Sequence, residues 1–177
     1  EFEVRAAPNS LGAERALLGW MVTRMTYRGE GIFLHAASIR AKDGAWLLVG
    51  GPGVGKSTAC GLLGDRSLCT NVTCLREVDG QWLAYPTAFT GQPDPPPPER
   101  GPFPVLGAIV LRKSETVGTI EPVSGTARMA WIAKAIVAHY PSLPECTSYV
   151  VGALASLVAD CPVYTLSFRR DAISIPD

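Results

Sequence analysis

The fold is decided by the stretch Gly50-Gly51-Pro52-Gly53-Val54-Gly55-Lys56-Ser57-Thr58. It fits the pattern G-x-x-x-x-G-K-[ST], which is typical of a phosphate-binding P-loop. Glycines let the backbone curl with its N–H groups pointing inward, and such a nest binds oxygen anions. Lys56 is then placed to reach the β- and γ-phosphates of a nucleotide, and the Ser57 hydroxyl to ligate Mg²⁺. We expect every residue of this stretch to contact the nucleotide, whose base the motif does not specify.

The segments on either side of this stretch support the motif. Residues 45–49 form a short apolar run that ends at the first glycine, and residues 58–63 continue as a helix. This gives the order strand, loop, helix, which distinguishes a P-loop from a Gly-rich turn that carries Lys-Ser by chance. Residues 31–40 predict a preceding strand, and Asp43-Gly44 indicates a hairpin turn. The P-loop strand should therefore pair antiparallel with its predecessor, unlike in a doubly wound fold, where a helix lies between them.

Composition sets broad limits on function. The chain has 177 residues, 47% hydrophobic and 18% charged, with a formal net charge of zero. This length suits one domain, residues 1–177, with a sizeable core. The absence of net charge argues against nucleic acid or a membrane surface as a partner. No leader or membrane-spanning run is visible in the sequence, so we expect a cytoplasmic protein. The five cysteines form no C-x-x-C pair and are expected to be buried free thiols.

Other segments complete an α/β fold with a mixed, partly antiparallel sheet. Asn9 or Ser10 is expected to cap a first helix that stops near Gly29. Residues 91–102 are rich in proline and predict a stiff surface loop, with a ligand for a proline-binding domain as the alternative. The further expected strands span residues 67–76, 81–85, 105–111, 117–121 and 162–168, and the further helices span residues 124–140 and 144–160.

Residues 31–38, the following hairpin and the P-loop resemble the C-terminal domain of HPr kinase/phosphorylase, and more closely the shorter HPr-kinase-related proteins. The resemblance covers most of the chain, although only this block is specific. It implies a fold related to phosphoenolpyruvate carboxykinase, with ATP and Mg²⁺ as cofactors and a serine hydroxyl as phosphate acceptor. Some of the shorter proteins sit beside peptide-modification genes, which favours a peptide or protein acceptor. HPr kinases assemble as oligomers, which is consistent with a homo-oligomer here.

The resemblance also assigns site residues. His35 matches the histidine that precedes the P-loop in the family, near the phosphates. The family carries two aspartates after the P-loop helix, one of them the general base, and Thr70 and Asn71 stand in their place. Neither side chain accepts a proton at neutral pH. An alternating strand would place these two residues on opposite faces, so we expect Asn71 alone to face the γ-phosphate. The predicted catalytic residues are His35, Lys56 and Asn71.

Three functions follow from these residues. The first is an ATP-dependent kinase that phosphorylates a serine or similar hydroxyl, supported by the P-loop and by His35. The second is a nucleotide-binding pseudokinase, a regulatory or scaffold protein without phosphotransfer, supported by the Thr70-Asn71 pair. The third is a small-molecule kinase of the same fold. ATP turnover with Mg²⁺ separates the first and third functions from the second.

Overall fold

The computed structural model describes residues 11–89, 101–116, 118–138 and 143–176. The predicted helix cap, Asn9 or Ser10, lies outside these residues, and so do residues 91–100 of the proline-rich segment. The helices are α1 (Leu11–Tyr27), α2 (Lys56–Leu63), α3 (Thr126–Ala133) and α4 (Pro144–Asp160), with a short 3₁₀ turn, η1 (Gly64–Arg66). The strands are β1 (Ile32–Leu34), β2 (Ala36–Ala41), β3 (Gly44–Val49), β4 (Ser67–Cys69), β5 (Thr73–Val78), β6 (Gln81–Pro86), β7 (Phe103–Lys113), β8 (Ile120–Pro122) and β9 (Val163–Phe168).

All the described strands join one mixed sheet. Its main path runs β1-β5-β6-β7-β3-β2-β4, and β9 pairs with both β7 and β8. The central strands β3, β7 and β9 are parallel, whereas β2 pairs antiparallel with both β3 and β4. The predicted mixed, partly antiparallel α/β fold is therefore confirmed. The predicted antiparallel hairpin is confirmed as well, with Ala36 opposite Val49 and Ala41 opposite Gly44.

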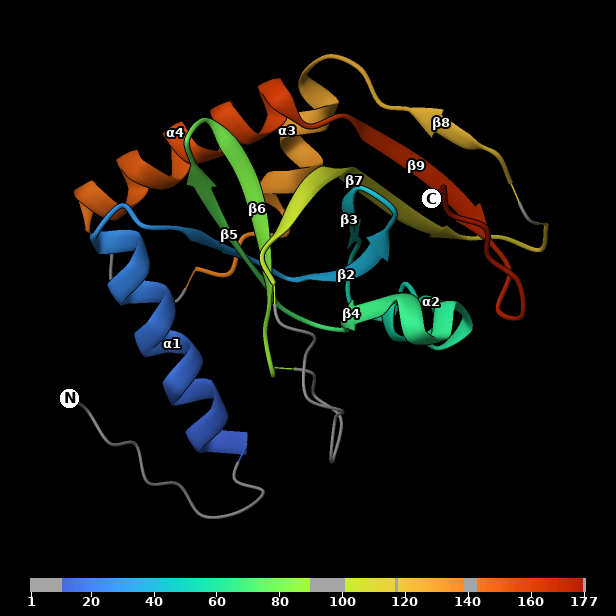
Figure 1. Cartoon of the computed structure of the whole chain (residues 1–177), viewed down its shortest axis with the longest axis horizontal. Helices are drawn as coiled ribbons and strands as arrows, with labels where there is room; N and C mark the ends of the chain where they lie inside the picture. Colours follow the sequence, from blue (N-terminus) through green and yellow to red (C-terminus); the bar gives the residue numbers. More distant parts are fainter. Residues whose placement is uncertain (1–10, 90–100, 117, 139–142, 177) are drawn as a thin grey trace.

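Helices cover both faces of the central strands (Figure 1), with α3 and α4 on one face and α2 on the other. Because side chains alternate along a strand, Leu47 of β3 packs in the cluster beneath α3 and α4, and Leu48 packs in the cluster beneath α2. Both side chains are at most 1% exposed. Burying a leucine side chain stabilises the fold by about 1.5–3 kcal/mol, so two-sided burial fixes the strand that leads into the P-loop.

Two predicted strands are interrupted. The strand expected over residues 31–40 breaks at His35, which separates β1 from β2, and the strand expected over residues 67–76 breaks at residues 70–72, which separate β4 from β5. Both breaks have the same cause, because β1 pairs with β5 whereas β2 pairs with β4. Each predicted strand changes its partner at the break, and the pattern of apolar residues does not reveal such a change.

The helix predicted over residues 124–140 is also shorter in the structure, since α3 ends at Ala133. The chain beyond α3 runs against β1 instead. The Val137 amide donates to the Phe33 carbonyl at 2.8 Å, and the His35 amide donates to the Ala135 carbonyl at 2.6 Å. These bonds replace the helical ones that the Val137 amide and the Ala135 carbonyl would form if α3 continued. None of the helices in the described part of the chain is long and apolar enough to cross a membrane.

Candidate functional site

The predicted strand, loop and helix around the P-loop are present. Strand β3 ends at Val49, and α2 begins at Lys56. Between them, Gly53 has a φ of +72° and Gly55 a φ of +106°, backbone conformations that favour glycine. The loop therefore needs glycine where the motif supplies it. It places the N-terminus of α2, with its unpaired N–H groups and positive end of the helix dipole, at the edge of a pocket.

Lys56 is the buried cation of this loop. The residue is 6% exposed, and its Nζ donates to the Gly50 carbonyl at 2.8 Å. Burial lowers the pKa of its ammonium group, because removal from water disfavours the charged form. The Lys56 side chain folds back over the loop, where its Nζ reaches the backbone of Gly50. Phosphate oxygens are stronger acceptors for an ammonium group than a carbonyl, so an anion at the loop can take over this donor.

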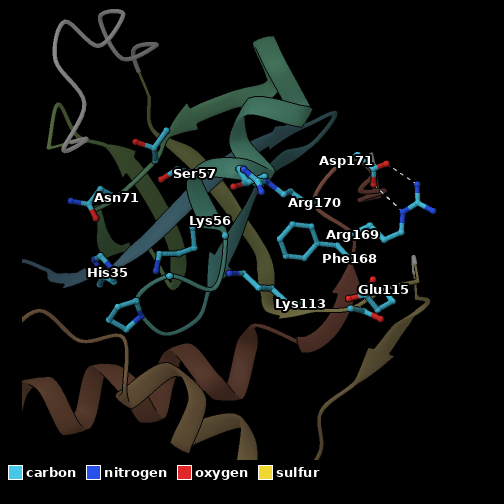
Figure 2. A pocket seen from close by; sticks show the side chains of 16 residues that line it. His35, Lys56, Ser57, Asn71, Lys113, Glu115, Phe168, Arg169, Arg170 and Asp171 are labelled. Carbon is cyan, nitrogen blue, oxygen red and sulfur yellow. Dashed lines mark hydrogen bonds and ion pairs between the residues drawn. The ribbon is translucent and has the colours of Figure 1, made fainter.

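The pocket has a volume of about 1330 Å³ and is shared by three groups of residues (Figure 2). One group is the P-loop with the start of α2. A second, which we name the polar flank, comprises His35, Thr70 and Asn71. A third, which we name the basic flank, comprises residues 113–115 at the end of β7 and residues 168–171 at the end of β9. The predicted catalytic residues His35, Lys56 and Asn71 thus line one pocket.

The polar flank is built at the two strand breaks. His35 is half-buried, and burial, followed by the nearby charge of Lys56, lowers the pKa of its imidazole. Thr70 and Asn71 lie between β4 and β5, where no strand alternation applies, and both line the pocket. The strand alternation on which the expectation for Asn71 rested is therefore absent at this point, and which of the two residues faces a γ-phosphate stays a prediction. The adjoining Thr73 hydroxyl donates to the Ala36 carbonyl at 2.9 Å and ties this break to β2.

Sequence reasoning did not identify the basic flank. It arises because β7 and β9 are parallel and end together, with Lys113 opposite Phe168 in the register. The Ser114 amide donates to the Phe168 carbonyl at 3.0 Å, which joins the two loops. A Cβ atom added to Gly55 would lie 2.8 Å from Cζ of Phe168, so this ring abuts the P-loop. The signal in the sequence is the Arg169-Arg170-Asp171 run that follows the final strand.

The carboxylates of the pocket lie on the basic flank, away from Asn71 (Figure 2). Asp171 accepts two hydrogen bonds from Arg169, both at 2.9 Å, and this pairing lowers the pKa of its carboxyl group. Among the described residues, no group of three or more His, Cys, Asp or Glu side chains could hold a metal ion. The Ser57 hydroxyl, the oxygen that the motif assigns to Mg²⁺, lines the pocket near the start of α2.

Comparisons with protein-family models and with curated proteins found no match. Among solved structures, a similar chain is the HPr(Ser) kinase/phosphatase from Coxiella burnetii. The match has a TM-score of 0.40 and 14% sequence identity, and it covers 77% of this chain and 85% of that chain. Similarity at this level assigns no function, and membership of the HPr kinase family stays a prediction.

Proposed function

We propose that the pocket binds ATP with Mg²⁺ and that the chain transfers the γ-phosphoryl group to a hydroxyl of a peptide or protein. The observation that carries this proposal is the shared pocket: a P-loop with its lysine at the N-terminus of α2 opens onto the same cavity as His35 and Asn71. Phosphoryl transfer depends mainly on positioning and charge stabilisation, which such an arrangement supplies. The amides of the loop and Lys56 would bind the β- and γ-phosphates.

The polar flank would handle the acceptor. Because the pKa of His35 lies below its ordinary value of 6.5, its imidazole is neutral at pH 7 and can accept the proton of the hydroxyl. The Asn71 amide can hydrogen-bond the same hydroxyl but cannot remove its proton. A bound Mg²⁺ would neutralise charge on the phosphates, and the Ser57 hydroxyl would be its ligand from the protein. His35 thus takes the place of the aspartate base that Thr70 and Asn71 do not provide.

A second candidate is nucleotide binding without phosphotransfer. The observation that favours it is the position of the carboxylates, which line the basic flank and not the polar flank. Loss of a general base typically lowers a rate by about 10²–10⁴. If His35 does not act as a base, the pocket would bind and release nucleotide as a regulatory or scaffold element.

Binding is tested first, with Lys56→Ala in a thermal unfolding assay with ATP and Mg²⁺. A ligand at 100 times its Kd stabilises the folded state by about 2.7 kcal/mol, and Lys56→Ala should remove most of that effect. Lys42→Ala is the matched control, because Lys42 is an exposed lysine in the turn between β2 and β3. If the Lys56 variant responds to ATP as the wild type does, the P-loop does not bind nucleotide.

Transfer is tested next, by Mg²⁺-dependent ATP turnover of the wild type, His35→Gln and Asn71→Asp. His35→Gln should lower turnover by about 10²-fold or more if the imidazole is the base. Asn71→Asp should leave ATP affinity nearly intact, and it should raise turnover by at least about tenfold if a base is what the polar flank lacks. Asn71→Leu, which adds no base, should not raise turnover. Unchanged turnover in His35→Gln would refute the assignment of the base, and absence of turnover in every variant that binds ATP would support the second candidate.

A further inference from the structure

The two flanks of the pocket differ in chemistry, and this difference bears on the orientation of the nucleotide. The polar flank offers neutral hydrogen-bonding groups, and Figure 2 shows the Lys56 side chain directed toward His35 on this side. A P-loop lysine reaches the β- and γ-phosphates. The end of the triphosphate should therefore lie at the polar flank, and the nucleoside should leave the P-loop toward the basic flank.

The size of the pocket leaves room for a nucleoside there. Ligand pockets in proteins commonly measure about 300–1,000 Å³. This one measures about 1330 Å³ and extends beyond the P-loop along the ends of β7 and β9. A triphosphate alone would leave the basic flank without a ligand group, whereas a complete nucleotide extends over both parts.

The basic flank carries the groups that a ribonucleoside needs. Arg170 is exposed to the pocket, and a planar guanidinium stacks well on an aromatic ring system. Glu115 forms no ion pair or hydrogen bond with another residue in the described part of the chain, so its carboxylate is available to accept hydrogen bonds from ribose hydroxyls. Arg169, by contrast, is held by Asp171.

The flank is also fixed in place, as a binding site requires. The Gly118 amide donates to the Ser167 carbonyl at 2.8 Å, in addition to the bond between Ser114 and Phe168 described above. Phe168 is 2% exposed, and its ring rests against the P-loop at Gly55. The loops that carry Glu115 and Arg170 are thus held to each other and to the phosphate-binding loop.

We propose that the basic flank is the nucleoside subsite, where Arg170 stacks on the base and Glu115 accepts hydrogen bonds from the ribose hydroxyls. This inference rests on the proposed function, because it requires that the P-loop bind the triphosphate. It makes ATP a better ligand than inorganic tripolyphosphate. It also makes ATP a better ligand than its 2′-deoxy analogue, because the analogue offers Glu115 one hydroxyl fewer.

The experiment is calorimetric titration of the full chain with ATP, 2′-deoxy-ATP and tripolyphosphate, each with Mg²⁺. Arg170→Lys keeps the charge and removes the planar group, so ATP affinity should fall by about fivefold or more while tripolyphosphate affinity stays within about twofold. Glu115→Gln should reduce the preference for ATP over 2′-deoxy-ATP by a similar factor. Arg112→Lys is the matched control, because Arg112 is exposed near the end of β7 and does not line the pocket.

The outcomes separate this inference from the proposed function. Wild-type protein that binds tripolyphosphate as tightly as ATP would refute the nucleoside subsite and leave the P-loop assignment intact. Equal losses for ATP and tripolyphosphate in Arg170→Lys would place this side chain on the phosphates and would also refute the subsite. Failure of the wild type to bind either ligand would refute both proposals. The thermal midpoint of each variant, measured without ligand, confirms that the variants are folded.

Discussion

Replacing Gly55 by alanine should destabilise the protein for two separable reasons. The residue has a φ of +106°, and a Cβ atom there would lie 2.8 Å from Cζ of Phe168. A left-handed conformation costs a non-glycine residue about 1–2 kcal/mol, and overpacking a buried contact costs about 1–3 kcal/mol. Phe168 is 2% exposed and ends a central strand, so its ring has little room to move away. We therefore expect a total loss of about 2–5 kcal/mol in the free energy of unfolding.

Gly53→Ala is the matched control in the same loop. Gly53 has a φ of +72°, but a Cβ atom there would have no neighbour within 4 Å. Its substitution should cost only the backbone term, about 1–2 kcal/mol. The difference between the two variants, measured by urea denaturation, then isolates the contact with Phe168. In thermal unfolding, each kcal/mol should lower Tm by about 2–4 °C for a chain of this size.

A double-mutant cycle with Phe168→Leu makes this test stricter. Leucine lacks the ring carbon that Cβ would strike, so Gly55→Ala should cost about as much as Gly53→Ala when leucine occupies position 168. Two results would refute the reasoning. One is a Gly55→Ala loss no larger than that of Gly53→Ala. The other is a loss that stays the same whether residue 168 is phenylalanine or leucine, which would show that the ring and the P-loop are not in energetic contact.

Other consequences of the structure can be measured directly. The folded-state pKa of His35 lies below 6.5, so the unfolded chain binds a proton more readily, and the free energy of unfolding should fall as the pH drops below 6.5. In urea titrations, His35→Gln should therefore lose less stability than the wild type between pH 7.5 and 5.5. Parallel stability profiles of the two proteins would contradict this prediction. Burial raises the pKa of Cys60 to about 11 and that of Cys74 to about 12. These two thiols should therefore react slowly with Ellman's reagent at pH 8 until urea unfolds the chain and all five cysteines react. Fast labelling of the native protein would show that the thiols are accessible. Arg128 donates to two carbonyls at the C-terminal end of α4. Arg128→Met should therefore lower the free energy of unfolding, measured by urea denaturation, by about 1–3 kcal/mol, and a decrease below about 0.5 kcal/mol would show that these bonds contribute little.

Local patterns predicted the parts of the site that are continuous in sequence. The spacing from Gly50 to Ser57 required a turn with glycine in left-handed positions, and the structure has it at Gly53 and Gly55. Asp43-Gly44 predicted the hairpin that delivers β3 to the loop. Both features depend on backbone conformation and hydrogen bonding between near neighbours, so the sequence alone carries enough information to predict them.

Strand continuity was harder to predict. An apolar run shows that residues are buried, but it does not identify the strand beside them. The breaks at His35 and at residues 70–72 occur where the partner strand changes, which depends on residues distant in the chain. The consequence for the site is large, because the second break lets both Thr70 and Asn71 line the pocket.

The sequence by itself thus determined the P-loop, its lysine and the hairpin before it, because each is a local arrangement with a steric requirement. Only the tertiary structure decided what surrounds the loop. Parallel pairing of β3 with β7 and of β7 with β9 brings the ends of these strands together, and so places residues 113–115 and 168–171 beside a loop more than 50 positions earlier in the chain. Nothing local to Arg170 or Glu115 indicates that pairing, since it follows from burial of the central strands between helices on both faces.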